Sequence, residues 1–371
     1  MPDTQSFASF AIPSLSVMQP PSSSLPTSIE QRLSAAREAI AAVRFADAMQ
    51  LLRDLLPDTA HLPELHFEVL MTRCIWHYYQ PETAAAIEWG QRAIEHAQLT
   101  LTPGHEARAR ALLANVRDMA GDIEGALSDA TLALASADRE DGLARARAFA
   151  ALAHVAQRAG EEELCFSLLR QGIDAAAKHD AVRSSLLLVA GAAQARFALE
   201  RWWMQTLEAD AATHAHVSVV SGTQLNAVLG TRTNHGRGLI AEGEALLAQG
   251  RFAEAQQCLA QGIAHVQDQG ASELADAISL NAYCLARLGR VAEALPLAQQ
   301  ARASIMQAAS RDPEMRLTVL RSVAEVLRLA AHSEAELARI EWLDAQAALD
   351  AFRASISERL RAQHPVPVQA G

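Results

Sequence analysis

Lysine, aromatic residues and long apolar runs are all scarce in this 371-residue sequence, and two of these shortages exclude a class of protein. Lys178 is the only lysine, and the formal net charge is −11. A general nucleic-acid-binding protein needs a basic footprint, which this composition lacks. The longest apolar run, Leu186 to Ala193, is far shorter than the roughly 20 residues that span a bilayer. We therefore expect no direct nucleic-acid partner and no membrane partner.

Cysteine is scarce as well, and its placement argues against a disulfide-bonded secreted protein. Cys74, Cys165, Cys258 and Cys284 lie far apart and form no CxxC pair. In a chain of this length the pattern indicates reduced, buried thiols. The N-terminus has no basic segment followed by an apolar block, so we expect no signal peptide. The sequence predicts a cytoplasmic protein.

Catalytic and metal-binding motifs are also missing. There is no GxxxxGK[ST] phosphate loop, no HExxH zinc helix and no GxSxG nucleophile turn. His214, His216 and His235 come nearest to a ligand cluster, but residues two apart on a helix point about 200° apart. We expect no enzyme activity, no cofactor and no metal.

The residues that are abundant favour helices. Half of the sequence (50%) is apolar although only 5% is aromatic, and alanine and leucine supply most of the apolar content. Both are strong helix formers, while the residues that favour strands are sparse. The composition predicts an all-α protein packed through small side chains.

A repeat of about 40 residues begins at Ile29. Segments such as Gly121–Ala126 and Gly250–Ala255 share one order: a helix stop, a short turn, an apolar residue and then an alanine in the next helix. Equivalent positions recur at intervals of 38 to 41 residues, with one interval of 50. They are Ala48, Ala86, Ala126, Cys165, Gln205, Ala255, Ala294 and Ala335.

A second set of small residues lies twelve positions before each of these. Seven of its eight members are small, which lets two helices approach closely. The regularity predicts eight stacked helix pairs. The set is Ala36, Cys74, Ala114, Ala153, Ala193, Gly243, Ala282 and Val323.

This pattern resembles the tetratricopeptide (TPR) repeat, a helix-turn-helix unit with a small residue in each helix at their closest contact. The resemblance covers roughly residues 30–350 and implies an all-α, right-handed superhelical solenoid of about eight antiparallel helix pairs. The period exceeds the usual 34 residues, and the family's Trp and Tyr in the first helix and Pro after the second are not in place. In its long repeats the chain is more similar to the TPR arrays of bacterial regulators such as MalT-type activators.

The chain divides into five predicted segments. Residues 1–28 form a Ser/Pro-rich tail that we expect to be disordered, and 29–216 carry repeats one to five. The 50-residue interval predicts an insertion loop with one short helix over 217–236. Repeats six to eight occupy 237–350, and a helix extension and tail occupy 351–371. That extension is either a solubilising cap or a helix that forms a homodimer or transmits an output.

The first helix of each pair lines the concave face of a solenoid, so partner-binding residues should point inward from these helices. Six arginines face few carboxylates there, and arginine forks suit acidic groups while tyrosines add contact area. We hypothesise that the groove binds an acidic or amphipathic peptide or helix; a merely solvated face is the alternative. The candidate residues are Tyr78, Tyr79, Arg108, Asn115, Arg147, His154, Arg158, Gln194, Arg237, Tyr283, Arg287 and Arg328.

The expected function is that of a non-catalytic interaction module, an adaptor or regulatory scaffold with a protein or peptide partner. Trp202 and Trp203 lie in the turn of the fifth unit; we expect one ring in the core, and the other is either core or a partner anchor. The alternative function is a ligand- or signal-peptide-sensing domain of a bacterial signalling or transcription system. In that alternative, residues 217–236 contribute to the ligand pocket.

Overall fold

The computed structural model describes residues 28–80, 82–208, 210–266, 274–307 and 312–363. Within these ranges the regular structure consists of sixteen α-helices and one short 3-10 helix, Ala176–Lys178, with no strand. The all-α prediction is confirmed. The predicted tail, except for Ser28, lies outside the described residues. None of the described helices is long and apolar enough to cross a bilayer.

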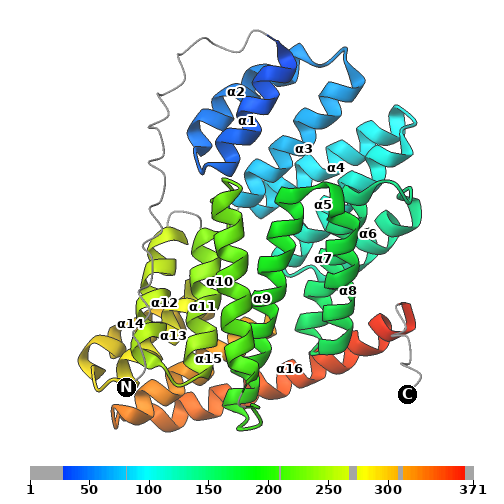
Figure 1. The fold of residues 1–371 in the computed structure, drawn as a ribbon. Helices are drawn as coiled ribbons and strands as arrows, with labels where there is room; N and C mark the ends of the chain where they lie inside the picture. The colour runs from blue at the N-terminus through cyan, green and yellow to red at the C-terminus, as the bar shows by residue number, and fades with distance from the viewer. Residues whose placement is uncertain (1–27, 81, 209, 267–273, 308–311, 364–371) are drawn as a thin grey trace, which may run out of the picture.

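The α-helices form eight successive antiparallel pairs, and each pair packs on the next along the chain (Figure 1). This arrangement is the helical repeat fold expected from the small-residue pattern. The pairs are α1 (Ile29–Ala41) with α2 (Phe45–Asp58), α3 (Pro63–Tyr79) with α4 (Thr83–Leu99), α5 (Pro103–Met119) with α6 (Ile123–Ser136), α7 (Gly142–Arg158) with α8 (Glu162–Ala175), α9 (Asp180–Trp203) with α10 (Ala211–Val228), α11 (His235–Ala248) with α12 (Phe252–Val266), α13 (Leu274–Arg287) with α14 (Val291–Gln307), and α15 (Pro313–Leu329) with α16 (Ala335–Gln363).

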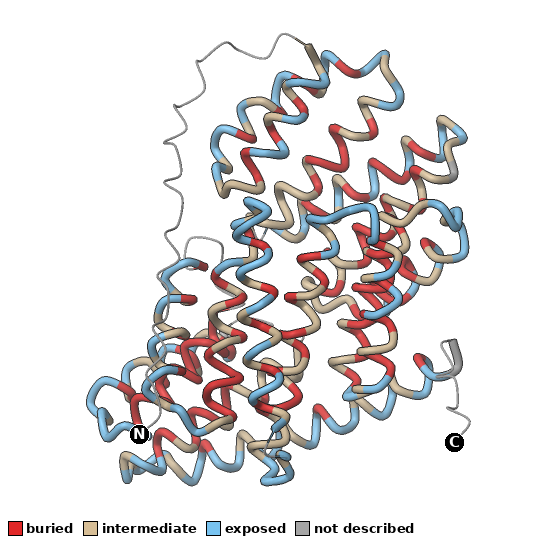
Figure 2. Tube along the Cα trace, in the orientation of Figure 1, coloured by how far each residue is buried: buried red, intermediate tan, exposed pale blue. Residues whose placement is uncertain are grey.

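The small residues lie where the two helices of a pair touch. Cys74 is fully buried, and its Sγ donates a hydrogen bond of 3.3 Å to the carbonyl oxygen of Ala86 in the partner helix. A Cβ atom added to Gly243 would lie 2.6 Å from Cγ of Leu259, closer than carbon atoms can approach. The pattern therefore marks real close contacts between backbones. In Figure 2 the buried residues follow the sides on which helices meet.

The predicted insertion loop at 217–236 is wrong. Residues 217–228 are the second part of the 18-residue helix α10. The extra residues of this unit lie earlier, because α9 has 24 residues where α7 has 17, and a connection that includes 204–208 follows it. Gln205 falls in that connection, and the fully buried Ala215 takes the predicted place in the helix contact.

Two glycines explain why a helix forms where a loop was expected. A Cβ atom on Gly222 would lie 2.8 Å from Cα of Leu188, and one on Gly191 would lie 2.8 Å from the backbone nitrogen of Val219. Glycine is a weak helix former, but here it lets α9 and α10 pack backbone to backbone. Tertiary packing thus overrides the local signal.

The eighth unit is also out of register. Ala335, the predicted contact residue, is only partly buried, whereas Ala338 is completely buried. The connection between α15 and α16 runs from 330 to 334, longer than the three-residue turn between α13 and α14. The longer turn moves the contact three residues along α16.

The far end of α16 closes the array. This helix runs along the lower edge of the molecule from α15 to α7 and α8 (Figure 1). Ile356 and Leu360 are buried and belong to the same hydrophobic cluster as side chains of α7 and α8. Ser357 Oγ donates a hydrogen bond of 3.3 Å to the carbonyl oxygen of Ala159. We call residues 351–361 the clasp.

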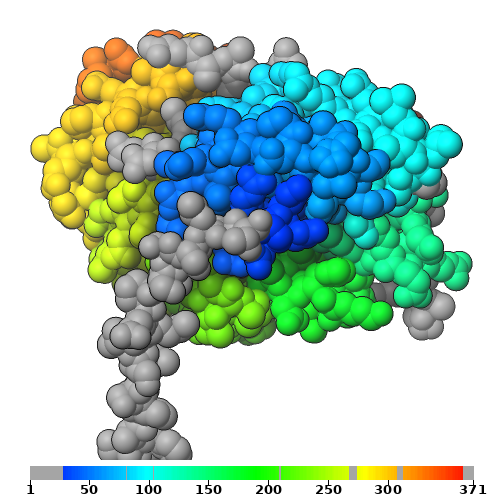
Figure 3. Space-filling view, turned by 90° about the horizontal axis from the view of Figure 1, so that it is seen from above, coloured from blue at the N-terminus to red at the C-terminus, as the bar shows by residue number. Residues whose placement is uncertain are grey.

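The opposite end of the array also meets distant units. The backbone N–H of Arg232, after α10, donates a hydrogen bond of 3.0 Å to the carbonyl oxygen of Ala41 at the end of α1. Seen from above, the blue N-terminal helices lie across the middle of the molecule, between yellow and cyan segments (Figure 3). The first unit of the array is therefore also in contact with the connection after α10.

Candidate functional site

The inner face is crossed by ion pairs between units far apart in the sequence. On α7, Arg158 Nε lies 3.0 Å from Oδ1 of Asp118 on α5. The same guanidinium pairs with Asp312, the residue that caps α15. His154 lies 3.4 Å from Asp118 through its Nδ1. These contacts tie the third and fourth units to the eighth.

A second cluster is centred on Arg196 of α9. Its Nη2 lies 2.6 Å from Oε1 of Glu244 on α11 and 3.0 Å from Oδ2 of Asp276 on α13. Its Nε lies 3.8 Å from Oε1 of Glu314 on α15. One partly buried arginine therefore faces three carboxylates from three helices. We call the two clusters together the inner charge network.

Burial and ion pairing shift the pKa values in this network in opposite directions. Burial raises the pKa of Glu244 to about 7, although the Arg196 charge opposes the shift. Burial also raises the pKa of Asp118, but Arg158 and His154 outweigh it and hold that pKa below its ordinary value. Arg196 keeps a raised pKa because Glu244, Asp276 and Glu314 outweigh its desolvation. Two cations therefore favour the ionised form of Asp118, whereas the nearby Asp276 and Glu314 add to the burial that favours the protonated form of Glu244.

We expect a Glu244→Gln variant to gain stability relative to the natural protein as the pH rises. Glu244 has an ordinary pKa of 4.5, so its carboxyl takes up a proton on folding between that value and about 7. A raised carboxyl pKa contributes stability that is present at low pH and lost as the pH rises through it. The expected change in the variant's advantage is about 2–3 kcal/mol between pH 5 and pH 8.

Urea denaturation of the two proteins at four pH values measures that change. Arg196, Asp276 and Glu314 face Glu244 from the neighbouring helices and are present in both proteins, so the comparison isolates the removal of one ionisable carboxyl. Glu88→Gln, on the exposed face of α4, is the matched control and should show no such rise. A pH-independent difference for Glu244→Gln would contradict the assigned pKa.

Several predicted partner-binding residues are occupied within the fold. Arg108 lies 2.9 Å from Asp141, and Arg328 lies 2.8 Å from Glu325. Together with Arg158, three of the six arginines thus have carboxylate partners in their own chain. Asn115 Nδ2 donates hydrogen bonds of 2.8 and 3.0 Å to the carbonyl oxygens of Ala111 and Arg147. The expected excess of positive charge is largely cancelled along this part of the face.

Other predicted residues gather near the N-terminal units. The Tyr78 and Tyr79 rings lie 5.1 Å apart, and the Arg237 guanidinium lies 6.0 Å from the Tyr78 ring. Burial lowers the pKa of Arg147, which has no hydrogen bond or ion pair through its side chain within the described ranges. The buried Oε1 of Gln194 also has no partner there. These residues are brought together only in part.

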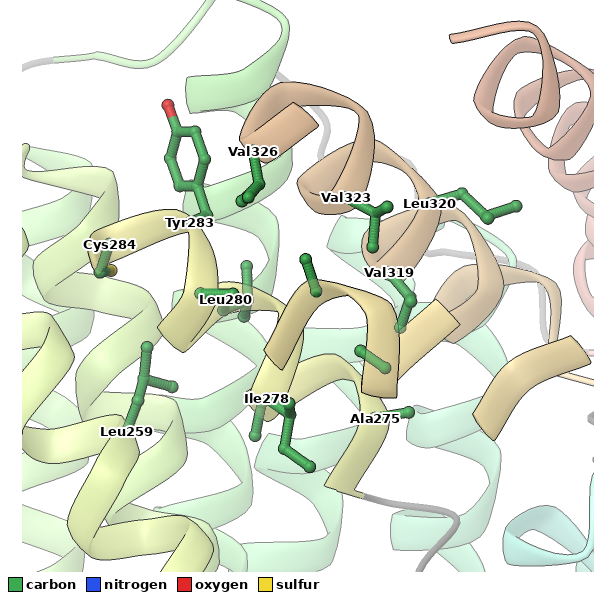
Figure 4. Packing of buried hydrophobic residues seen from close by; sticks show 14 of the residues in the cluster. Leu259, Ala275, Ile278, Leu280, Tyr283, Cys284, Val319, Leu320, Val323 and Val326 are labelled. Carbon is green, nitrogen blue, oxygen red and sulfur yellow. The ribbon is translucent and has the colours of Figure 1, made fainter. Parts of the chain in front are cut away.

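Tyr283 and Arg287 line an open cavity of about 430 Å³ between the ends of α9, α13, α15 and α16. Tyr283 stands at the edge of the largest hydrophobic cluster with its hydroxyl pointing away from the packed side chains (Figure 4). We call this cavity the aromatic–arginine pocket. Its lining is Trp202, Trp203, Gln205, Tyr283, Arg287, Arg321, Glu325 and Trp342.

Aromatic rings form the pocket walls. The Trp202 and Trp203 rings lie 4.7 Å apart, and Trp203 lies 4.9 Å from Tyr283. The guanidinium of Arg321 lies 4.9 Å from both the Trp203 and the Trp342 rings and donates a hydrogen bond of 2.6 Å to the carbonyl oxygen of Trp203. Such stacking fixes the arginine and both indoles in place.

A narrower cavity of about 40 Å³ shares Trp203 and Arg321 with the pocket. Its lining also includes Arg196 and Glu314 of the inner charge network. The two cavities therefore lie on either side of the same two side chains. Sequence reasoning missed Arg321 and Trp342. Arg321 lies seven residues before Arg328, two helical turns away on the same face, whereas no local signal places α16 beside α9.

The predicted absence of a metal site concerns three histidines. His216 Nε2 lies 3.3 Å from Oε1 of Glu242, and the His235 ring stacks edge-on with His265 at 4.9 Å. Within the described ranges, no group of three or more His, Cys, Asp or Glu residues could hold a metal ion. The structure does not bring His214, His216 and His235 into one such group.

Comparison with known proteins identifies the fold. No protein-family profile and no curated protein sequence matches the chain. A Rap protein solved in complex with competence and sporulation factor aligns over 91% of this chain and 99% of that chain, with a TM-score of 0.56 and 13% identity. A STAND protein with a tetratricopeptide repeat sensor from Pyrococcus horikoshii covers 91% of this chain and 50% of that chain, with 11% identity and a TM-score of 0.44, too low to carry an argument. The fold is TPR-like.

Proposed function

We propose that this protein is a non-catalytic regulatory module that binds a peptide segment of a partner on its concave face, anchored in the aromatic–arginine pocket. One observation carries the proposal. Tyr283, Arg287 and the Trp202–Trp203 pair, each singled out by the sequence, converge on one open cavity. Tryptophan, tyrosine and arginine dominate the binding energy of protein interfaces. A cavity of about 430 Å³ also falls within the range of ligand pockets.

The filled interior favours the pocket over the rest of the concave face. Arg108, Arg158 and Arg328 already have carboxylate partners, so a peptide would have to displace them. Binding energy is better supplied by a preformed aromatic cavity, which needs no such displacement. The Rap protein of similar fold was solved with competence and sporulation factor, which supports a peptide-binding use of such an array.

We further propose the location, role and subfamily expected from the sequence: a cytoplasmic adaptor or scaffold that resembles the long-repeat arrays of MalT-type regulators. A homodimer through the C-terminal helix would use the exposed Leu337, Ile340 and Leu343 of α16, because Ile356 and Leu360 are buried within their own chain. Analytical ultracentrifugation of an Ile340→Asp variant tests that state: a dimer that persists unchanged argues against this face.

A ligand-sensing domain is the second candidate function. One observation favours it: α16 supplies Trp342 to the pocket wall and also carries the clasp, so a single helix connects the pocket with the clasp. A ligand in the pocket would then alter closure of the array. Thermal-shift measurements against metabolites and peptides separate the two functions, since stabilisation by a small molecule alone supports sensing.

Selection from a display library of random twelve-residue peptides tests the principal proposal. Peptides recovered on the purified protein should bind Trp202→Ala at least about 2 kcal/mol more weakly, or about thirtyfold. Trp89→Ala is the matched control. Trp89 is also a partly buried indole in contact with arginines, Arg73 and Arg92, but it belongs to the hydrophobic cluster of α3, α4 and α5 and does not line the pocket. The proposal fails if no peptide is enriched, or if the enriched peptides bind both variants equally.

A further inference from the structure

We infer that the aromatic–arginine pocket selects a peptide in which an acidic residue adjoins an aromatic or large apolar one. The inference rests on the proposed function and names the chemistry of its ligand. The pocket combines flat apolar walls with a cation at the rim, and each feature selects one part of the ligand.

The walls set the apolar part. Three indoles and one phenol surround the cavity. Trp203 contacts the Trp202 ring at 4.7 Å and the Tyr283 ring at 4.9 Å, and Trp342 contacts Arg321. A planar ring or a large apolar side chain fits such flat faces.

The charges set the acidic part. The lining contributes two arginines and one carboxylate, Glu325, and that carboxylate accepts hydrogen bonds of 2.8 and 3.0 Å from Arg328. The pocket therefore keeps an excess of positive charge in a protein whose net charge is −11. An anionic group is attracted to such a local field. A basic peptide would be repelled by it.

Arg287 is the residue placed to bind that anion. Its side chain is exposed at the rim, 4.3 Å above the Phe252 ring, and it donates one hydrogen bond of 2.7 Å to the Tyr283 hydroxyl. No carboxylate pairs with it among the described residues. Arg321 is less available, because it is stacked between two indoles and donates to a backbone carbonyl. An arginine has five donors, so most of those on Arg287 remain for a carboxylate.

The two parts must be adjacent in the ligand. Arg287 and the ring of Tyr283 lie one helical turn apart on α13, joined by a hydrogen bond. A carboxylate on Arg287 therefore sits beside the aromatic walls and not at a remote point. Neighbouring side chains of one peptide satisfy this spacing.

A double-mutant cycle on the library peptides tests the inference. Peptides whose binding depends on Trp202 should contain Asp or Glu next to an aromatic or large apolar residue. Changing that acid to its amide should weaken binding to the natural protein about tenfold, as expected for a charged hydrogen bond. On Arg287→Gln the same change should have almost no effect, and on Arg290→Gln the tenfold preference should persist. Arg290 lies in the connection between α13 and α14, where it is exposed and paired with Glu293, which makes it a matched control.

Three outcomes separate the inference from the function on which it rests. Trp202-dependent peptides that are neutral or basic would overturn the inference and leave the function standing. A preference for the acid that survives in Arg287→Gln would overturn the role of that arginine. If no peptide depends on Trp202, the proposed function itself is wrong, and the inference falls with it.

Discussion

Replacing Leu360 with aspartate should lower the free energy of unfolding by about 3 kcal/mol and release the clasp from α7 and α8. Leu360 is 0% exposed in the cluster that also contains Leu152 and Leu168. The variant loses the burial of a full leucine side chain and would bury a carboxylate without a cation. Undocking is less costly than keeping the charge inside, so the end of α16 should leave the array.

The ion pairs of the clasp should not hold it in place. Arg361 lies 2.8 Å from Glu161, and Arg359 pairs with Glu124, but both arginines are largely exposed. Exposed ion pairs contribute about 0–1 kcal/mol each, so apolar burial must dominate. Arg353 is more buried than these two arginines. It pairs with Glu200 and donates a hydrogen bond to the carbonyl oxygen of Arg158.

Leu132→Asp is the matched control for this experiment. Leu132, on α6, is 46% exposed, so its replacement should change stability by less than about 0.5 kcal/mol. Hydrogen exchange of residues 351–361, measured beside urea denaturation, reports the release directly. Equal losses in the two variants, or unchanged exchange in Leu360→Asp, would show that the clasp does not hold the array closed.

The repeat was predictable because its signal is local and is repeated many times. Ala48, Ala86, Ala126 and Ala255 each mark a contact between helices adjacent in the chain, and all four are fully buried. The prediction went wrong where one local signal has two meanings. Gly222 indicates a turn by its low helix propensity, yet it is the residue on which α9 and α10 approach. Only the packing partner, Leu188, decides between the two.

The candidate site was predictable only in part, for a related reason. Tyr283 and Arg287 follow from the helical face they occupy, and both line the pocket. Closure of the array is not encoded in any one repeat. Asp312 neutralises Arg158 from 154 positions away, so the expected surplus of positive charge could not be corrected from local sequence. Trp342 reaches the pocket for the same reason.

Replacing Arg196 with methionine should be among the most damaging single changes in the molecule, with a loss of about 3–5 kcal/mol at pH 8. Methionine keeps most of the apolar length of the side chain but removes the charge that faces Glu244, Asp276 and Glu314. Three carboxylates would then stay in the interior without a nearby cation, and removing one partner of a buried ion pair is far more costly than removing both.

The pH dependence of this loss distinguishes lost charge from lost packing. Without Arg196 the folded-state pKa values of Glu244 and Glu314 rise further, because burial already raises both and the arginine opposes both shifts. Groups with raised carboxyl pKa values destabilise the fold most above those values and least when protonated, so the loss should shrink as the pH falls from 8 to 5. Arg290→Met, at an exposed pair with Glu293, should cost less than about 0.5 kcal/mol at either pH. A loss for Arg196→Met that is the same at pH 5 and pH 8 would mean that the arginine acts through its packing and not as the counter-charge that joins α9 to α11, α13 and α15.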